Sequence, residues 1–164
     1  MKFQLVDRIV SIDRGKRIVT LKALSLAEEY LADHFPAFPV MPGVLMIEAM
    51  VQSAAWLVRV EQDFAKSIIE LSAARNVRPA SFVKPGDVLR CELDATEITD
   101  SSAKFKGAGF VGDEPIVSGR LELKCFNLVD MDKRLASADA AIVAQLRRQF
   151  QLIGGPALLG WEEA

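Results

Sequence analysis

Histidine and cysteine are scarce in this sequence, with one histidine and two cysteines among 164 residues. His34 is the single imidazole, and Cys91 and Cys125 lie far apart and outside any Cys-x-x-Cys pair. A zinc site needs several Cys or His ligands, and a disulfide framework needs more cysteines than this. We therefore expect no metal site and no other bound cofactor.

An excess of positive charge is also missing. Twenty Lys and Arg residues against 22 Asp and Glu residues give a formal net charge of −2. Proteins that coat nucleic acid or an anionic membrane need a basic excess, so we expect neither partner. The first residues run straight into a strand-like pattern, without the basic and then apolar regions of a signal peptide. That pattern predicts a cytoplasmic protein.

One stretch, residues 35–58, is apolar enough to suggest a membrane helix. Glu48 is the only charged residue in it, and three prolines interrupt its first third. A carboxylate at the centre of a bilayer costs about 2.5–3.5 kcal/mol. The uninterrupted part, Gly43 to about Val60, is therefore expected to be a helix that the rest of the protein covers.

The rest of the chain predicts an antiparallel sheet. Apolar and polar residues alternate along several segments, which is typical of strands with one covered face. One buried helix cannot connect six parallel strands, so the fold class is α+β, with the sheet curling around that helix. The predicted strands span 5–12, 17–21, 68–77, 88–98, 103–111 and 119–126, with a short helical turn at 25–29 and an amphipathic helix over 137–153. In that last helix Ser137 is the expected N-cap, and the apolar stripe is Ile142, Leu146, Phe150 and Ile153.

Glu48 is the most informative residue of the apolar helix. A carboxylate in such surroundings must be paired, hydrogen-bonded or protonated. Gln52 lies one turn later on the same face and can hold one of its oxygens. Glu48 is therefore a candidate proton donor, and the alternative is a purely structural carboxylate. His34 is a candidate base at neutral pH, and the alternative is a histidine whose ring a backbone carbonyl satisfies.

The start of the apolar helix is a third candidate element. Pro42 is expected at its first position, and the amides of Gly43, Val44 and Leu45 have no partner within the helix. They point out at the positive end of the helix dipole and can stabilise an enolate-like oxygen. A base, an acid and such amides together suggest proton abstraction next to a carbonyl, with loss of a leaving group.

These residues resemble a known family signature. Residues 34–45 read HFPAFPVMPGVL, and Ile47-Glu48-Ala49-Met50 and Gln52 follow. This block is similar to that of hotdog-fold 3-hydroxyacyl-(acyl-carrier-protein) dehydratases, and more to the FabZ type, which has Glu on the helix, than to the FabA type, which has Asp. The interval of fourteen positions from His34 to Glu48 fits that family, and the resemblance extends over about residues 3 to 126.

The resemblance implies a dehydratase that acts on 3-hydroxyacyl thioesters, with an acyl carrier protein as partner. His34 would remove the α-proton, Glu48 would assist departure of the 3-hydroxyl as water, and Gly43, with Val44 and Gln52, would bind the substrate. The family pattern also implies a homodimer, or a larger assembly of dimers, in which His34 faces Glu48 of the partner subunit.

Some features depart from this pattern. Ala37 replaces a usual glycine, and Ala55-Trp56 replaces a small, glycine-containing step, which narrows the acyl tunnel. We expect one hotdog domain over 1–127 and a C-terminal helical extension over 128–164, loose at its end except for Trp161. A thioesterase on the same fold and a non-catalytic acyl-binding protein are the alternative functions. Basic residues that could meet an acidic carrier are Arg75, Arg78, Lys84, Lys104 and Lys106.

Overall fold

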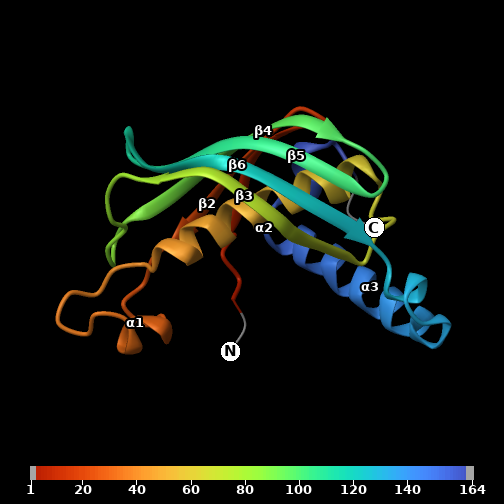
Figure 1. Ribbon diagram of the computed structural model, residues 1–164, viewed down its shortest axis with the longest axis horizontal. Coiled ribbons are helices and arrows are strands. Elements are labelled where there is room, and N and C mark those ends of the chain that lie inside the picture. The colour runs from red at the N-terminus through yellow and green to blue at the C-terminus, as the bar shows by residue number, and fades with distance from the viewer. Residues whose placement is uncertain (1–2, 162–164) are drawn as a thin grey trace.

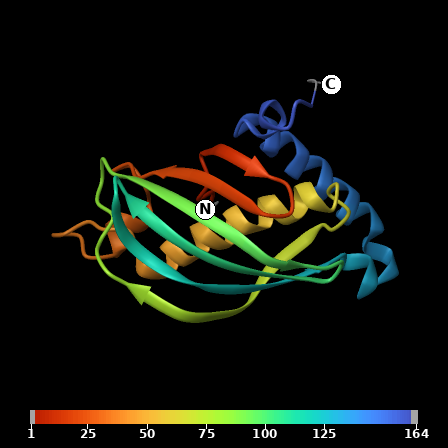
Figure 2. The same cartoon turned by 90° about the horizontal axis from the view of Figure 1, so that it is seen from above.

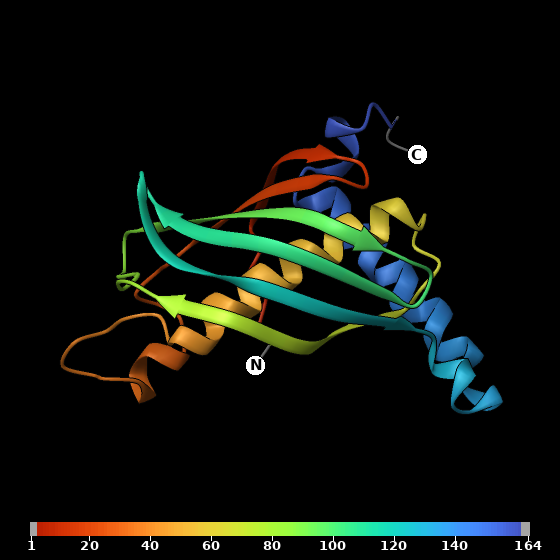
Figure 3. The same ribbon diagram turned by 45° about the horizontal axis from the view of Figure 1, so that its top comes forward.

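The computed structural model describes residues 3–161. Within these residues six strands form an antiparallel sheet in the order β1-β2-β4-β5-β6-β3 (Figure 1). The sheet curls around helix α2 (Gly43–Glu61), as Figures 2 and 3 show from two further directions. This confirms the predicted α+β class and the predicted wrapping of the sheet around the apolar helix. The strands are β1 (Arg8–Asp13), β2 (Arg17–Ala23), β3 (Ile68–Pro79), β4 (Val88–Ile98), β5 (Ser102–Val111) and β6 (Glu114–Phe126).

The core lies between the sheet and α2. In β4, Leu89 and Leu93 are fully buried, whereas Arg90 between them points to the wetter face. Every residue of α2 from Val51 to Val58 is buried except Gln52. Burial of one large apolar side chain stabilises a fold by about 1.5–3 kcal/mol, so this shared core fixes the helix against the sheet.

Helix α2 also has the length and composition of a membrane span. Its apolar window has a mean hydropathy of 1.4, but 61% of that window is buried inside the protein. A core helix of a soluble protein passes the same test. The burial agrees with the prediction that the protein itself covers this helix.

The N-terminal segment differs from the prediction. The first strand begins at Arg8 instead of Leu5. The amide of Leu5 donates to Gln52 Oε1 at 2.9 Å, and Gln52 Nε2 donates to the carbonyl of Phe3 at 3.0 Å. A glutamine side chain of α2 therefore satisfies backbone groups that a sheet ladder would otherwise bind, and a period-two pattern cannot reveal this.

The segment before α2 contains a single-turn helix, α1 (Tyr30–Asp33). The helical turn predicted at 25–29 is instead a non-helical turn, in which the Ser25 hydroxyl accepts from the amide of Ala27 at 3.1 Å. The Pro-rich segment 35–42 is neither helix nor strand, as predicted. Pro42 is the N-cap of α2 rather than its first residue, because its backbone is extended while its carbonyl accepts from Leu45 and Met46.

After the sheet, the chain forms two short 3-10 helices, η1 (Leu128–Asp130) and η2 (Lys133–Leu135), and then helix α3 (Ala136–Leu152). The predicted helix is confirmed, but its N-cap is Leu135 and not Ser137. Asp139 instead fixes the first turn of α3. Its carboxylate accepts from the amides of Leu128 and Val129, both at 2.9 Å, and from the hydroxyl of Ser67.

Phe150 attaches α3 to the core. Its ring centroid lies 5.8 Å from that of Trp56 and 5.5 Å from that of Phe64. Ile142, at the other end of the predicted stripe, is only half-buried. A Cβ atom on Gly155 would lie 2.1 Å from Phe150 Cε2, so only glycine fits there.

The tail does not remain loose where the prediction says it should. Helix α4 (Gly155–Leu158) forms after Gly154, whose φ is 84°. Trp161, the one residue of the tail that the prediction excepted, packs as expected, with its ring centroid 5.9 Å from that of Phe150. The expectation of a loose tail at residues 162–164 lies outside the described residues. The division of the chain into a domain over 1–127 and an extension over 128–164 stays a prediction.

Candidate active site

Gln52 holds Glu48 in place. Its Nε2 donates to Glu48 Oε1 at 2.9 Å, one turn earlier on α2. The same side chain is bonded to the backbone of Phe3 and of Leu5, so the amide cannot turn without losing a bond. Glu48 and Gln52 are both half-buried. The predicted contact between them is present, and it orients one carboxylate oxygen of Glu48.

Glu48 and Gln52 line a groove that follows α2 toward its C-terminal end. Its volume is about 250 Å³, slightly below the roughly 300–1,000 Å³ of typical small-molecule sites. The lining is mixed, with Glu48 at one end and apolar side chains in between. The other lining residues are Phe3, Gln4, Val51, Ala55, Trp56, Arg59, Ile69, Leu146 and Gln149. A groove with this lining can bind a flexible apolar chain, with the carboxylate of Glu48 beside one end of it.

His34 lies directly after α1, at the start of the Pro-rich loop. It is half-buried, and its ring centroid is 4.5 Å from that of Phe35. Phe35 has a φ of 49°, in the left-handed region that bulky residues avoid. Such strained residues persist only where the surroundings fix them, and they cluster at functional sites. His34 does not line the groove that contains Glu48.

The first turn of α2 is open to solvent. Gly43 and Val44 are exposed, and Val44 is 72% exposed. The amide of Leu45 donates to the carbonyl of Pro42 at 2.9 Å, so the prediction that this amide lacks a partner is wrong. The first-turn amides of Gly43 and Val44 are the ones that can bind a substrate oxygen at this end of the helix dipole.

Three exposed phenylalanines lie on the Pro-rich segment before α2 and on the loop after β3. Phe35, Phe38 and Phe82 are each at least half exposed, and the rings of Phe38 and Phe82 meet edge to face at 6.0 Å. Exposed apolar patches of this kind mark interaction surfaces. Val40 and Met41, in the same Pro-rich segment, are each 1% exposed and are buried by their own chain.

The basic residues that could meet an acidic carrier do not form one continuous surface patch. Arg75, Lys104 and Lys106 share a hollow on the outer face of the sheet with Arg120. Arg78 and Lys84 do not line that hollow, and Lys84 Nζ lies 6.0 Å from the ring of Phe38. Glu122 and Glu97 neutralise two of the cations, because they bond to Arg75 and Lys104 at 2.9 and 2.6 Å.

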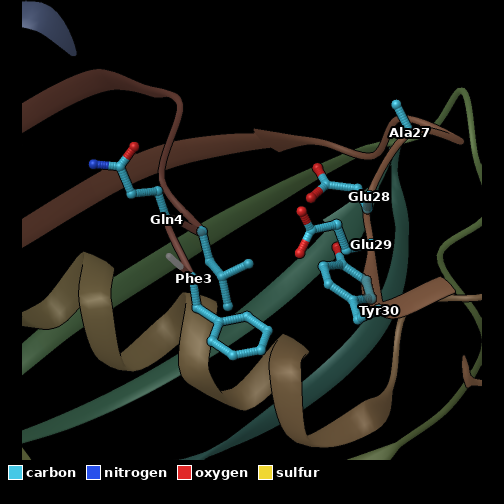
Figure 4. A pocket seen from close by; sticks show the side chains of 7 residues that line it. Phe3, Gln4, Ala27, Glu28, Glu29 and Tyr30 are labelled. Atoms are coloured by element: carbon cyan, nitrogen blue, oxygen red, sulfur yellow. The ribbon is translucent and has the colours of Figure 1, made fainter. Parts of the chain in front are cut away.

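A second hollow lies on the other side of the N-terminal segment (Figure 4). Phe3 and Gln4 line both hollows, and Glu28, Glu29 and Tyr30 close this one. The hydroxyl of Tyr30 is buried without a hydrogen-bond partner among the described residues. Burial, with the charge of Glu28, holds the pKa of Tyr30 far above its ordinary value. This tyrosine is therefore a neutral phenol and no proton acceptor.

Several features of the site were not foreseen. Arg59, Leu146 and Gln149 line the groove, although they are remote from the motif, and only tertiary packing brings α3 to α2. A charged residue within an apolar helix is the one signal that could have identified Arg59. Both cysteines are buried thiols as predicted, and burial raises the pKa of Cys91 to about 12. In the described part of the chain no cluster of His, Cys, Asp and Glu could hold a metal ion.

Known proteins match the part of the chain that contains His34, Glu48 and Gln52. Residues 1–120 match the model of the FabA-like domain. A 3-hydroxyacyl-(acyl-carrier-protein) dehydratase FabZ from Pelotomaculum thermopropionicum is 42% identical over 112 residues, which cover 68% of this chain and 80% of that protein. The FabZ from Variovorax paradoxus is 41% identical over 115 residues, which cover 68% and 77%.

Solved structures share the fold at lower identity. The dehydratase heterocomplex ApeI:P from Xenorhabdus doucetiae matches with a TM-score of 0.67 and 19% identity, over 81% of this chain and 90% of that one. A hypothetical thioesterase protein with coenzyme A from Streptococcus pneumoniae matches with a TM-score of 0.52 and 9% identity, over 72% and 84%. At such identities the likeness concerns the fold alone. The sequence matches go further, and they show that the chain belongs to the family of FabZ-type hotdog-fold dehydratases.

Proposed function

We propose that the protein removes water from a 3-hydroxyacyl thioester bound to an acyl carrier protein, giving the 2-enoyl thioester in fatty-acid or related acyl-chain synthesis. The observation that carries the proposal is Glu48, held by Gln52 at one end of an acyl-sized groove. The FabZ relatives are named as dehydratases of this substrate class. We place the protein in the cytoplasm, where carrier-bound acyl chains are made.

The proposed chemistry divides between three groups. The imidazole of His34 takes the proton from C2, and the electron pair of that C–H bond moves toward the thioester carbonyl. The amides of Gly43 and Val44 stabilise the oxygen that gains charge. The bond from C3 to its hydroxyl then breaks, and Glu48 supplies the proton with which the hydroxyl leaves as water. Transfer of the proton from His34 to Glu48 restores both groups.

We propose that two chains complete each site. Glu48 lines the groove and His34 does not, while Phe35 and Phe38 beside His34 are exposed. A second copy that covers these aromatic side chains would bring His34 of one protomer to Glu48 of the partner subunit. Two-fold pairing is the commonest closed arrangement of a homo-oligomer, and such dimers could assemble further.

Turnover of defined thioesters tests the proposed reaction. The protein is incubated with 3-hydroxyacyl and with 2-enoyl thioesters, and both the enoyl absorbance and free thiol are followed. Reversible hydration supports a dehydratase, whereas release of thiol would replace it with a thioesterase. If neither occurs, the protein only binds acyl chains. His34→Ala and Glu48→Gln should each reduce turnover by about 10²-fold or more, the usual contribution of a positioned acid or base.

Mixing the two inactive variants tests the shared site. After random subunit exchange half of the dimers are mixed, and each mixed dimer holds one site with both residues intact if the pair spans two chains. We expect activity to reappear. If exchange is demonstrated, for instance with differently tagged chains, and activity stays absent, the pair lies within one chain and the cross-subunit proposal is wrong.

A further inference from the structure

Arg59 is a half-buried arginine of α2 that pairs with no carboxylate among residues 3–161. Its Nε is buried and has no hydrogen-bond partner among residues 3–161. Its guanidinium lies 5.0 Å from the centre of the Trp56 ring, and no carboxylate of the described residues pairs with it. Burial lowers the pKa of Arg59 to about 10, and the group is still charged at neutral pH. Arg59 as a whole is half-buried, and charges with little access to water are normally paired in proteins.

Arg59 lines the groove that begins at Glu48. The two residues are eleven positions apart on α2, which separates their backbones by about 16 Å along the helix axis. Along the same helix the proposed site orders the substrate, with the thioester carbonyl near Gly43 and C3 near Glu48. The acyl chain that continues from C3 therefore runs toward Arg59.

Helix α3 completes this end of the groove. Leu146 and Gln149, both half-buried, line it together with Arg59 and Trp56. The match to the FabA-like family model ends at residue 120, before α3. The end of the groove thus combines the amide of Gln149 with a guanidinium that has no partner among the described residues. Arginine donors in a fork suit a carboxylate, which can accept two hydrogen bonds from them.

We propose that Arg59, with Gln149 beside it, binds a carboxylate at the far end of the acyl chain, so that the protein acts on 3-hydroxyacyl thioesters with an anionic terminus. This rests on the proposed dehydration at Glu48. An extended chain advances about 1.2 Å per bond, so a carboxylate roughly 13 bonds beyond C3 spans the backbone separation. The reach of the arginine side chain shortens this to an acyl group on the order of ten carbons.

Substrate pairs of equal length test the assignment. We would measure kcat/KM for 3-hydroxyacyl N-acetylcysteamine thioesters of about eight to fourteen carbons, ending either in a methyl group or in a carboxylate. These thioesters carry no phosphate, so a preference cannot come from the phosphate of a carrier arm. The wild-type protein should prefer the carboxylate-ended chain. Arg59→Met should lose about 10- to 100-fold on that substrate alone, the range for a hydrogen bond to a charged group.

Controls separate specificity from folding. Arg147→Met removes a cation whose guanidinium lies 4.6 Å from the Phe64 ring and does not line the groove, so it should leave the preference intact. Arg59→Lys should retain part of it. Arg59→Met should melt no lower than wild type, because it removes a half-buried charge whose Nε has no hydrogen-bond partner among residues 3–161. A lower melting temperature together with equal losses on both substrates would make Arg59 structural and overturn the proposal.

The wild-type protein alone also decides the question, whatever the variants do. Equal kcat/KM for both chain ends at every length, or a preference that appears only with phosphate-bearing carriers, would refute carboxylate recognition by Arg59. The 3-hydroxybutyryl thioester is too short to reach Arg59 and reports only on the dehydration. If that substrate is not turned over either, the proposed function fails; if it is, only the inference about Arg59 fails.

Discussion

Gln52→Leu is the sharpest single test of how the site is held together. The substitution keeps most of the side-chain volume and removes three hydrogen bonds, to Glu48, to the carbonyl of Phe3 and from the amide of Leu5. Leu5 is buried, with 2% of its surface exposed. Water can replace the bonds at Glu48 and Phe3 more readily than the one at Leu5.

The loss of stability comes from the amide of Leu5, which loses its hydrogen-bond acceptor. An unsatisfied buried donor costs about 1–3 kcal/mol, so the free energy of unfolding should fall by roughly that amount. For a chain of this size each kcal/mol lowers the melting temperature by about 2–4 °C. Thermal denaturation followed by circular dichroism measures the change.

The effect on turnover should be larger than this loss of stability suggests. Without Gln52 the carboxylate of Glu48 is free to rotate, and a misplacement of about 1 Å can cost 10²-fold in rate. We expect kcat to fall by roughly 10- to 100-fold at a temperature where the variant is fully folded. The fall should remain smaller than that of Glu48→Gln, because Gln52 acts by positioning.

A double-mutant comparison isolates that role. If Gln52 acts through Glu48, adding Gln52→Leu to Glu48→Gln should cause little further reduction in kcat, because the effects of substitutions at coupled residues are not additive. Multiplication of the two losses would show that Gln52 contributes independently of Glu48. A Gln52→Leu variant with wild-type kcat would refute the positioning role altogether.

Two further predictions concern the attachment of α3. Phe150→Ala should lower the free energy of unfolding by about 3–5 kcal/mol, as for other buried aromatic residues, in denaturant titrations where exposed Leu152→Ala serves as the control. Burial acts to raise the pKa of Asp139, but hydrogen bonds from Ser67, Val129 and Leu128 prevail and lower it. Asp139→Asn should therefore be less stable than wild type at pH 7, and the difference should shrink once the pH falls below about 4, the ordinary pKa of aspartate. A difference that is constant from pH 7 to pH 3 would contradict this account, and Asp113→Asn, in an exposed turn, is the control.

The sheet and its central helix could be predicted because their signals are local. Strand β4 has the predicted bounds, Val88–Ile98, since apolar and charged residues alternate without a break from Leu89 to Ala95. Strand β6 begins at Glu114, five residues before its predicted start. Pro115 obscures that part of the pattern, and pairing with β5 and β3 extends the strand there. Tertiary pairing therefore decides the ends of strands where local composition is ambiguous.

The site was predictable only where it lies within one motif. Glu48 and Gln52 are one helical turn apart, so their contact follows from helix geometry. The bonds from Gln52 to residues 3 and 5 cross 47 or more positions, and no spacing rule could identify them. The same holds for Asp139, whose partner Ser67 lies 72 positions away. For such contacts the sequence supplies the polar group but not its partner.

Trp56 and helix α3 both depart from the family pattern, and they pack against each other. In place of the small step after Gln52, this chain has an indole that is 3% exposed, and Phe150 of α3 covers it with ring centroids 5.8 Å apart. Without α3 the large apolar face of Trp56 would lie open to water, and without Trp56 the ring of Phe150 would lose one of its aromatic partners. The same packing places Leu146 and Gln149 of α3 opposite Arg59. A bulky residue in the helix and a helix after the sheet are thus mutually dependent, and both contribute to the lining of the groove that contains Glu48.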